Sequence, residues 1–260
     1  MFVFLIPQLA FSQAVVPIKD NSFLIEEAYN QEKNIVQHIF FSQFQGSLKS
    51  FLLSLTQEWP IKDEHHQFSY TILLAQEPDR FSLNNFLLNY RYQLLNKNWL
   101  ALAPRFSVQM PVNKKNEQGW GLQLNIPASF DFKDKLFIHL NAGANFAWSY
   151  PGIGDPTKYV QVPIGAGIIY CPHPLINLMC EVLHTTNTLY RTEYFANGEP
   201  YDFVDSYKDL IVNPGIRCAI NFKNGLQIVP GFAVPTTISG TSYRTGYQFY
   251  LSFEHQIKKS

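Results

Sequence analysis

Three stretches in the middle of the chain alternate between apolar side chains and small or polar ones. They cover residues 100–110, 120–130 and 136–148, and in each the even-numbered residues are apolar. Period two is the side-chain period of a β-strand. The stretches have 11, 11 and 13 residues, whereas a typical globular strand has roughly 5 or 6 and a membrane-crossing strand needs about 9–11. The pattern therefore predicts long strands with one apolar and one polar face.

The same alternation along the rest of the chain predicts an all-β fold, an antiparallel transmembrane β-barrel of about 12 strands. Pro104, Pro127, Pro163, Pro214 and Pro230 fall inside predicted strands, where proline removes a ladder donor, so we expect bulges to absorb some of them. The predicted strands are 34–45, 48–59, 65–76, 84–95, 98–111, 118–132, 135–150, 158–171, 176–188, 209–222, 225–236 and 243–254.

The connections between these strands alternate in length. One end of the barrel has the short turns 61–64, 96–97, 133–134, 172–175 and 223–225. The other end has the longer links 77–83, 112–117, 151–157 and 189–209, with short exceptions near Gly46 and Gly240. Outer-membrane barrels have short periplasmic turns and longer external loops. The pattern favours a bacterial outer-membrane location, with lipid as a partner of the apolar face.

Tryptophan is found only near the ends of the predicted strands, at Trp59, Trp99, Trp120 and Trp148. Aromatic side chains form girdles at the two membrane interfaces of outer-membrane barrels. We interpret the four tryptophans as such interface residues, although a general preference of aromatics for strand ends is the simpler alternative.

The N-terminal part of the chain differs from the rest. Residues 1–14 resemble a secretory signal peptide without its positively charged n-region, or a mature N-terminus. In residues 15–33, Asn21 and Ser22 precede a run that predicts a short helical segment over 23–29. This segment carries Glu26, Glu27 and Glu32, and it could lie inside the lumen as a plug or in the periplasm. The barrel is assigned to residues 34–260.

Composition excludes several classes of function. The 20 basic and 20 acidic residues give no net charge, so nothing favours nucleic acid as a partner. Charged residues make up only 15% of the chain, against about 25% in soluble domains. The three cysteines have no CxxC spacing, which argues against a disulfide framework, a zinc site or another metal site. No motif indicates a cofactor.

Charged side chains of both signs fall on the predicted inner face. The bland interpretation is an ion-pair network that rigidifies a narrow barrel, and the sharper one is a polar constriction that selects solutes. Inward glycines, Gly165 and Gly215 among them, leave space for water, a ligand or the N-terminal segment. The candidate lumen residues are Glu58, Arg91, Arg105, Asp131, His139, Glu181, Arg217 and Glu254.

Enzyme chemistry has little support in the sequence. A lipase barrel would need Ser, His and an orienting Asn or Asp together. His139 and Asn141 share one predicted face, but no serine is evident near them in phase. GxSxG, HExxH and Walker patterns are absent. We therefore predict that the protein is not an enzyme and assign no catalytic residue.

Several runs resemble a known family, the outer-membrane transporters labelled "MetA-pathway of phenol degradation". They are residues 22–32, 36–38, 56–60, 181–187, 213–217 and 225–231. The resemblance covers nearly the whole mature chain and implies an outer-membrane barrel that takes up small molecules, aromatic or hydrophobic ones included. It implies no catalytic residues.

Together these features predict a passive channel or transporter for small molecules. A structural barrel with a plugged lumen is the second hypothesis, and a lipid-active barrel enzyme is the third. Oligomeric state has no signature in the sequence.

Overall fold

The computed structural model describes Ile18 and residues 22–45, 50–77, 80–112, 118–149, 157–194, 199–222 and 224–256. The proposed signal peptide, residues 1–14, lies outside the described residues. The described chain forms one antiparallel sheet that closes on itself, because β1 pairs with both β2 and β17. No helix of the described residues is long and apolar enough to cross a membrane.

Seventeen strand segments make up the sheet. Five barrel strands are each interrupted once, namely β4/β5, β6/β7, β12/β13, β14/β15 and β16/β17, so the barrel has the 12 strands that the sequence predicts. The segments are β1 Ile35–Gln45, β2 Ser50–Ile61, β3 Asp63–Glu77, β4 Arg80–Tyr92, β5 Leu95–Lys97, β6 Leu100–Leu102, β7 Arg105–Pro111, β8 Gln118–Phe132, β9 Leu136–Ser149, β10 Thr157–His173, β11 Ile176–Tyr194, β12 Pro200–Cys218, β13 Ile220–Asn221, β14 Gln227–Ala233, β15 Thr236–Ser239, β16 Ser242–Thr245 and β17 Tyr247–Gln256.

The breaks have local causes. Pro104 separates β6 from β7, and Pro235 lies between β14 and β15, because proline supplies no N–H to the ladder. Pro127 and Pro163 stay inside β8 and β10. The pairing between β9 and β10 skips Pro163. Gln161 and Ile164 each pair with a residue of β9, whereas the two residues between Gln161 and Ile164 do not.

The predicted phase of the central strands is confirmed. Leu124 on β8 is 46% exposed on the outer face, whereas Ser129 on the same strand is fully buried inside the barrel. Phe106, Leu122 and Phe146 are likewise exposed. A continuous apolar outer surface on a closed barrel is the surface that lipid covers in outer-membrane barrels.

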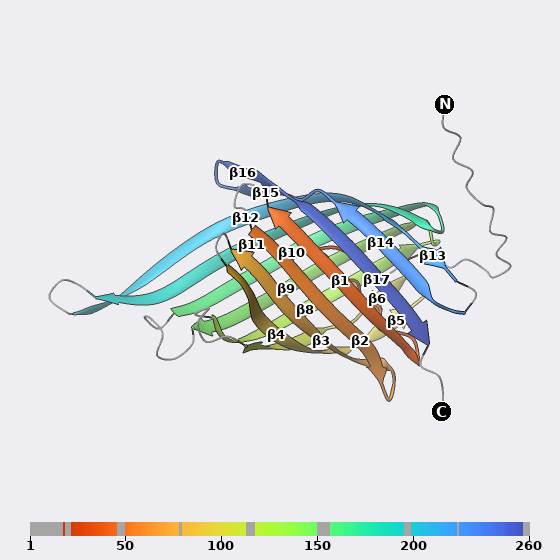
Figure 1. Cartoon of the computed structure of the whole chain (residues 1–260), viewed down its shortest axis with the longest axis horizontal. Helices are drawn as coiled ribbons and strands as arrows, with labels where there is room; N and C mark the ends of the chain where they lie inside the picture. Colours follow the sequence, from red (N-terminus) through yellow and green to blue (C-terminus); the bar gives the residue numbers. More distant parts are fainter. Residues whose placement is uncertain are drawn as a thin grey trace.

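The long loop predicted over residues 189–209 is wrong. β11 continues to Tyr194 and β12 begins at Pro200, and their register runs without a break from Ile176↔Cys218 to Tyr194↔Pro200. These two strands project beyond the rest of the barrel at one end (Figure 1). The ladder extends through the charged residues of this stretch because each added pair satisfies further backbone groups.

The short turns lie together at the opposite end. Lys133 and Asp134 both have a φ of 58°, and Gly225 has a φ of 83°. Positive φ is what tight hairpin turns require. The turn predicted at residues 96–97 is displaced, since β5 ends at Lys97 and β6 begins at Leu100.

Candidate functional site

Residues 22–34 are called the lumen segment below; residues 22–31 lie inside the barrel, and residues 32–34 are exposed where the segment turns into β1. Backbone N–H groups along it donate to side chains of the inner barrel wall. The segment forms bends and a turn, so the helical turns predicted over residues 23–29 are absent. The first four N–H groups of a helix have no internal partner, and here side chains of the wall accept the N–H groups of residues 23–26 without a helix forming.

Glu181 on β11 binds the start of the lumen segment. One carboxylate oxygen, Oε1, accepts hydrogen bonds from the backbone N–H groups of Phe23, Leu24 and Ile25, each at 3.0 Å. The other, Oε2, accepts from Nδ2 of Asn213 at 2.8 Å. Successive N–H groups that converge on an anion form a nest, which stabilises the buried negative charge.

Glycines on neighbouring strands make room for this part of the segment. A Cβ atom at Gly165 would lie 2.3 Å from Cδ1 of Ile25, and one at Gly215 would lie 2.9 Å from Cε2 of Phe23. A Cβ at Gly231 would lie 3.0 Å from Phe23 as well. The small inward residues seen in the sequence therefore serve, at these positions, to accommodate the lumen segment.

The inner face is not polar throughout. Phe137, Ile169, Cys171 and Met179 form a buried cluster that packs against Phe23. A second buried cluster, which also contacts Phe23, consists of Ile18, Ala219, Val229 and Tyr250. Apolar lumen side chains thus bury the apolar side chains of the segment, a contribution that strand alternation alone does not reveal.

The next part of the lumen segment binds Asn141 on β9, beside the strand of Gly165, and then Gln93 across the barrel, just after β4. Asn141 accepts the N–H of Glu26 at 2.8 Å and donates to its carbonyl at 2.6 Å. Gln93 does the same for two residues, accepting from the N–H of Asn30 and donating to the carbonyl of Ala28. These amide side chains replace the partners that a neighbouring strand would supply.

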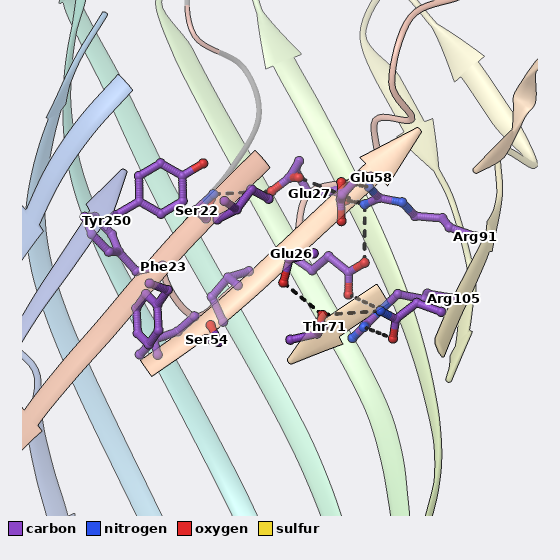
Figure 2. Close-up of a pocket in the computed structure, with 16 residues that line it drawn as sticks. Ser22, Phe23, Glu26, Glu27, Ser54, Glu58, Thr71, Arg91, Arg105 and Tyr250 are labelled. Carbon is purple, nitrogen blue, oxygen red and sulfur yellow. Dashed lines mark hydrogen bonds and ion pairs between the residues drawn. The ribbon is translucent and has the colours of Figure 1, made fainter. Parts of the chain in front are cut away.

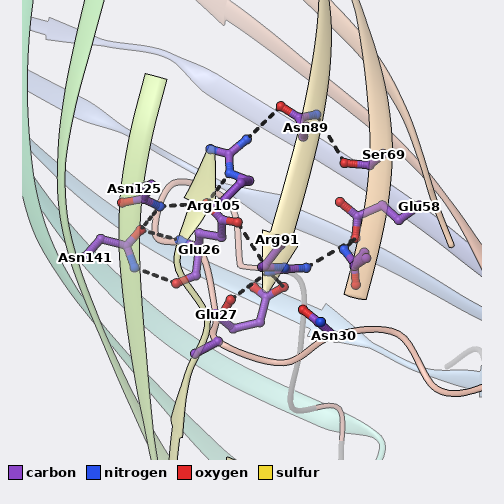
Figure 3. A network of polar contacts seen from close by, with 12 residues as sticks. Glu26, Glu27, Asn30, Glu58, Ser69, Asn89, Arg91, Arg105, Asn125 and Asn141 are labelled. Carbon is purple, nitrogen blue, oxygen red and sulfur yellow. Dashed lines mark hydrogen bonds and ion pairs between the residues drawn. The ribbon is translucent and has the colours of Figure 1, made fainter. Parts of the chain in front are cut away.

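Two predicted lumen arginines meet the glutamates of the segment (Figure 3). Nη1 of Arg91 on β4 lies 3.3 Å from Oε1 of Glu26, and Nε of Arg105 on β7 lies 2.9 Å from Oε2 of the same carboxylate. Arg91 also lies 3.5 Å from Glu58 and 4.0 Å from Glu27. The structure therefore brings Glu58, Arg91 and Arg105 together, with Glu26 between the two arginines.

A cavity of about 260 Å³ lies between the lumen segment and the wall (Figure 2). Glu26, Glu58, Arg91 and Arg105 line one side of it. Ile39, Phe41 and Tyr250, together with Phe23 of the segment, line another. The cavity is therefore both charged and aromatic, and it borders the Glu26 carboxylate.

The other predicted lumen residues lie apart from this group. Glu254 accepts from Gln37, and Arg217 is 1% exposed on β12 next to Gly231. Asp131 accepts from the N–H of Asp134 and so stabilises the turn after β8. Glu181 lies on the far wall with the Phe23 N–H. The charged residues thus form separate groups.

A serine does lie next to His139 on the same inner face of the sheet, contrary to the sequence-based expectation. Ser129 pairs with it across the β8–β9 hairpin, and Oγ lies 2.7 Å from Nδ1 of His139. The symmetry of the hairpin around residues 133–135 could have revealed the pair. Both residues are fully buried, and Ser129 also accepts the N–H of Ala28, so the lumen segment covers this pair.

The tryptophans lie where the sequence places them along the strands. Trp99 in the turn between β5 and β6 is 58% exposed, and Trp120 and Trp148 are exposed near the other end. Trp59 packs against Phe68 and Tyr70. Their role at a membrane interface stays a prediction.

Glu26, Glu27 and Asn141 were not among the predicted site residues, although the two glutamates were assigned to a segment that could plug the lumen. The available signal was complementary charge, since an acidic segment precedes a barrel whose inner face carries arginines. In the described part of the chain, no group of three or more His, Cys, Asp or Glu side chains could hold a metal ion.

Comparisons with known proteins support the fold. No family model matches the chain, and no curated protein matches it, so the resemblance to the phenol-pathway family stays a prediction.

Solved structures do match. The KdgM porin aligns with a TM-score of 0.54 at 10% identity, over 85% of this chain and 99% of that one. The same porin in complex with disordered oligogalacturonate gives a TM-score of 0.52 at 11% identity, over 86% and 99% of the two chains. The NanC porin gives 0.50 at 8% identity, over 83% and 98%. The chain thus has the fold of outer-membrane porin barrels, and this fold supports a bacterial outer-membrane location.

Proposed function

We propose that this protein is a passive outer-membrane channel for small molecules, in which the lumen segment sets the width of the pathway. The observation that carries the proposal is the cavity beside the segment, because it gives solutes a place next to charged and aromatic side chains inside a closed barrel. Ligand sites typically combine apolar walls with a few convergent polar groups, and this cavity has both kinds of lining, with the polar kind the larger. Porin-like barrels as a fold class support passive transport.

The lining favours solutes with a polar group over purely hydrophobic ones. Arg91, Arg105 and Glu58 would be left without water if an apolar molecule filled the charged side of the cavity, and desolvated charges are costly. A small molecule with a polar end and an apolar body matches both sides. Aromatic compounds as a class, which the family resemblance implies, fit this description when they carry a polar substituent.

A structural barrel with a closed lumen is the second candidate. It is favoured by the density of hydrogen bonds between the wall and the segment, in particular by the three N–H groups held by Glu181. A lipid-active enzyme has less support, because the Ser129–His139 pair lies under the lumen segment rather than on the outer wall.

Conductance of the purified protein in planar bilayers separates the two candidates. We expect small currents from the wild type and larger ones from Glu181→Ala, in which the lumen segment loses its main acceptor. Limited proteolysis at residues 22–34 shows whether the segment is released, and β-sheet circular dichroism shows whether the barrel is folded. If the folded wild type conducts no more than a protein-free bilayer, while a folded Glu181→Ala protein with a released segment does conduct, the channel proposal is refuted and the structural barrel with a closed lumen is supported.

A further inference from the structure

The Glu26 carboxylate occupies a binding site built by three different wall strands. Arg91 on β4 lies 3.3 Å from one oxygen. Arg105 on β7 lies 2.9 Å from the other, and Nδ2 of Asn125 on β8 donates to that same oxygen at 2.6 Å. Two guanidinium groups and an amide around one carboxylate form a charge-assisted site with defined geometry.

The donors and the acceptor belong to different parts of the molecule. Arg91, Arg105 and Asn125 are held by the barrel ladder, whereas Glu26 belongs to the lumen segment, which enters no strand pairing. A wall with this arrangement keeps its donors in place when the occupant changes. Arg91 retains Glu58 at 3.5 Å, but in the described part of the chain Glu26 is the only carboxylate within ion-pair distance of Arg105.

The site opens into the cavity and is partly accessible. The side chain of Glu26 is 19% exposed and that of Arg105 is 25% exposed, while Arg91 is 4% exposed. Figure 2 shows Glu26 and Arg105 at one side of this cavity and Phe23 with Tyr250 at the other. A carboxylate that replaced Glu26 would therefore have its body in the cavity, next to aromatic side chains.

We propose that Arg91, Arg105 and Asn125 form a binding site for small organic carboxylates, and that Glu26 is its built-in occupant. A carboxylate solute in the cavity competes with Glu26 for the two arginines and so loosens the charged end of the lumen segment. This inference rests on the proposed function in one respect, which is that solutes must be able to reach the cavity. The binding site itself is defined by the wall residues and does not depend on conduction.

Chemical rescue of a Glu26 variant tests the site. Glu26→Ala removes the occupant, and its midpoint unfolding temperature in detergent is measured against sodium acetate and sodium benzoate, with sodium chloride at equal ionic strength as the reference. We expect the variant to unfold at a lower temperature than the wild type. Acetate or benzoate should then recover most of the lost temperature in a saturable manner, while chloride should not.

Two controls make the result specific. Glu26→Ala combined with Arg105→Met should lose the rescue, because the site loses a guanidinium group. Glu32→Ala removes an exposed glutamate of the same segment and should show no carboxylate-specific stabilisation. If Glu26→Ala does not fold, Glu26→Ser replaces it in the same titrations.

A folded Glu26 variant that responds to neither carboxylate beyond chloride overturns the proposal, as does rescue that persists in the Arg105 double variant. The rescue experiment measures thermal stability, so its result does not depend on whether the protein conducts current in bilayers. Absence of current in bilayers would refute the channel and leave the carboxylate site standing, and absence of rescue would do the reverse.

Discussion

The lumen segment is held by two sides of the barrel that differ in kind. The anchoring wall consists of Gly165, Glu181, Gly215 and Gly231 on β10, β11, β12 and β14, and it contacts residues 23–25. The charged wall consists of Glu58, Arg91, Arg105 and Asn125 on β2, β4, β7 and β8, and it contacts residues 26 and 27. One side uses backbone hydrogen bonds and close packing, and the other uses ion pairs beside a cavity.

The two walls therefore differ in how readily their contacts with the lumen segment can be replaced. Backbone N–H groups bound to a buried carboxylate leave costly unsatisfied donors if the contact breaks. The ion pair between Glu26 and the 25% exposed Arg105 borders the water-accessible cavity and is weaker, because solvent and salt screen it. We infer that the anchoring wall keeps the segment in the barrel and that the charged wall is where a solute can compete with it.

The largest expected effect comes from the centre of the anchoring wall. Glu181→Ala removes the acceptor of three N–H groups and should lower the free energy of unfolding by about 3 kcal/mol, since hydrogen bonds to charged groups are the strong ones. Urea unfolding measures the loss, and amide hydrogen exchange at residues 23–25 locates it. The exposed Glu32 provides the control, Glu32→Gln. Unchanged exchange at residues 23–25 in Glu181→Ala would remove the basis for an anchoring wall.

A smaller effect is expected from the glycines. In Gly215→Val the new side chain would collide with Phe23 and with Cβ of Ala233, each 2.9 Å from the first added carbon, and overpacking of this kind costs about 1–3 kcal/mol. Gly167→Ala is the matched control, because a Cβ there meets its nearest neighbours at an ordinary 3.5 Å. Thermal unfolding of the two variants should differ clearly, and equal behaviour would mean that the segment adjusts without strain.

The smallest effect on stability should come from the charged wall. Arg105→Met removes a 25% exposed side chain from its ion pair with Glu26, and such pairs contribute less than about 1 kcal/mol. The variant should nevertheless shift the reversal potential of the Glu181→Ala channel toward cation selectivity, because a positive charge leaves the cavity. The shift should shrink in 1 M salt, where the Debye length falls to about 3 Å. A loss of stability as large as that of Glu181→Ala would erase the distinction between the two walls.

Much of the barrel was predictable from residues close together in the sequence. The alternation at Leu122, Leu124 and Ile126 reflects the two faces of a strand, and twelve such runs with short turns at one end sufficed for the barrel and its phase. Strand ends were less predictable. Residues 189–194 and 200–208 mix charged side chains with aromatic and aliphatic ones and were predicted to be a loop, yet they pair because each lies opposite the other.

The sequence by itself determined which face of each strand points outward and which faces the lumen, because side-chain period is a local property of the backbone. It also gave the candidate charges Glu58, Arg91, Arg105 and Glu181. Only the tertiary structure decided what these charges contact. Leu24 and Glu181 are 157 residues apart in the chain, and Glu26 meets Arg105 only after the barrel has closed around the lumen segment. Closure brings distant residues together, and no local pattern records which of them will meet.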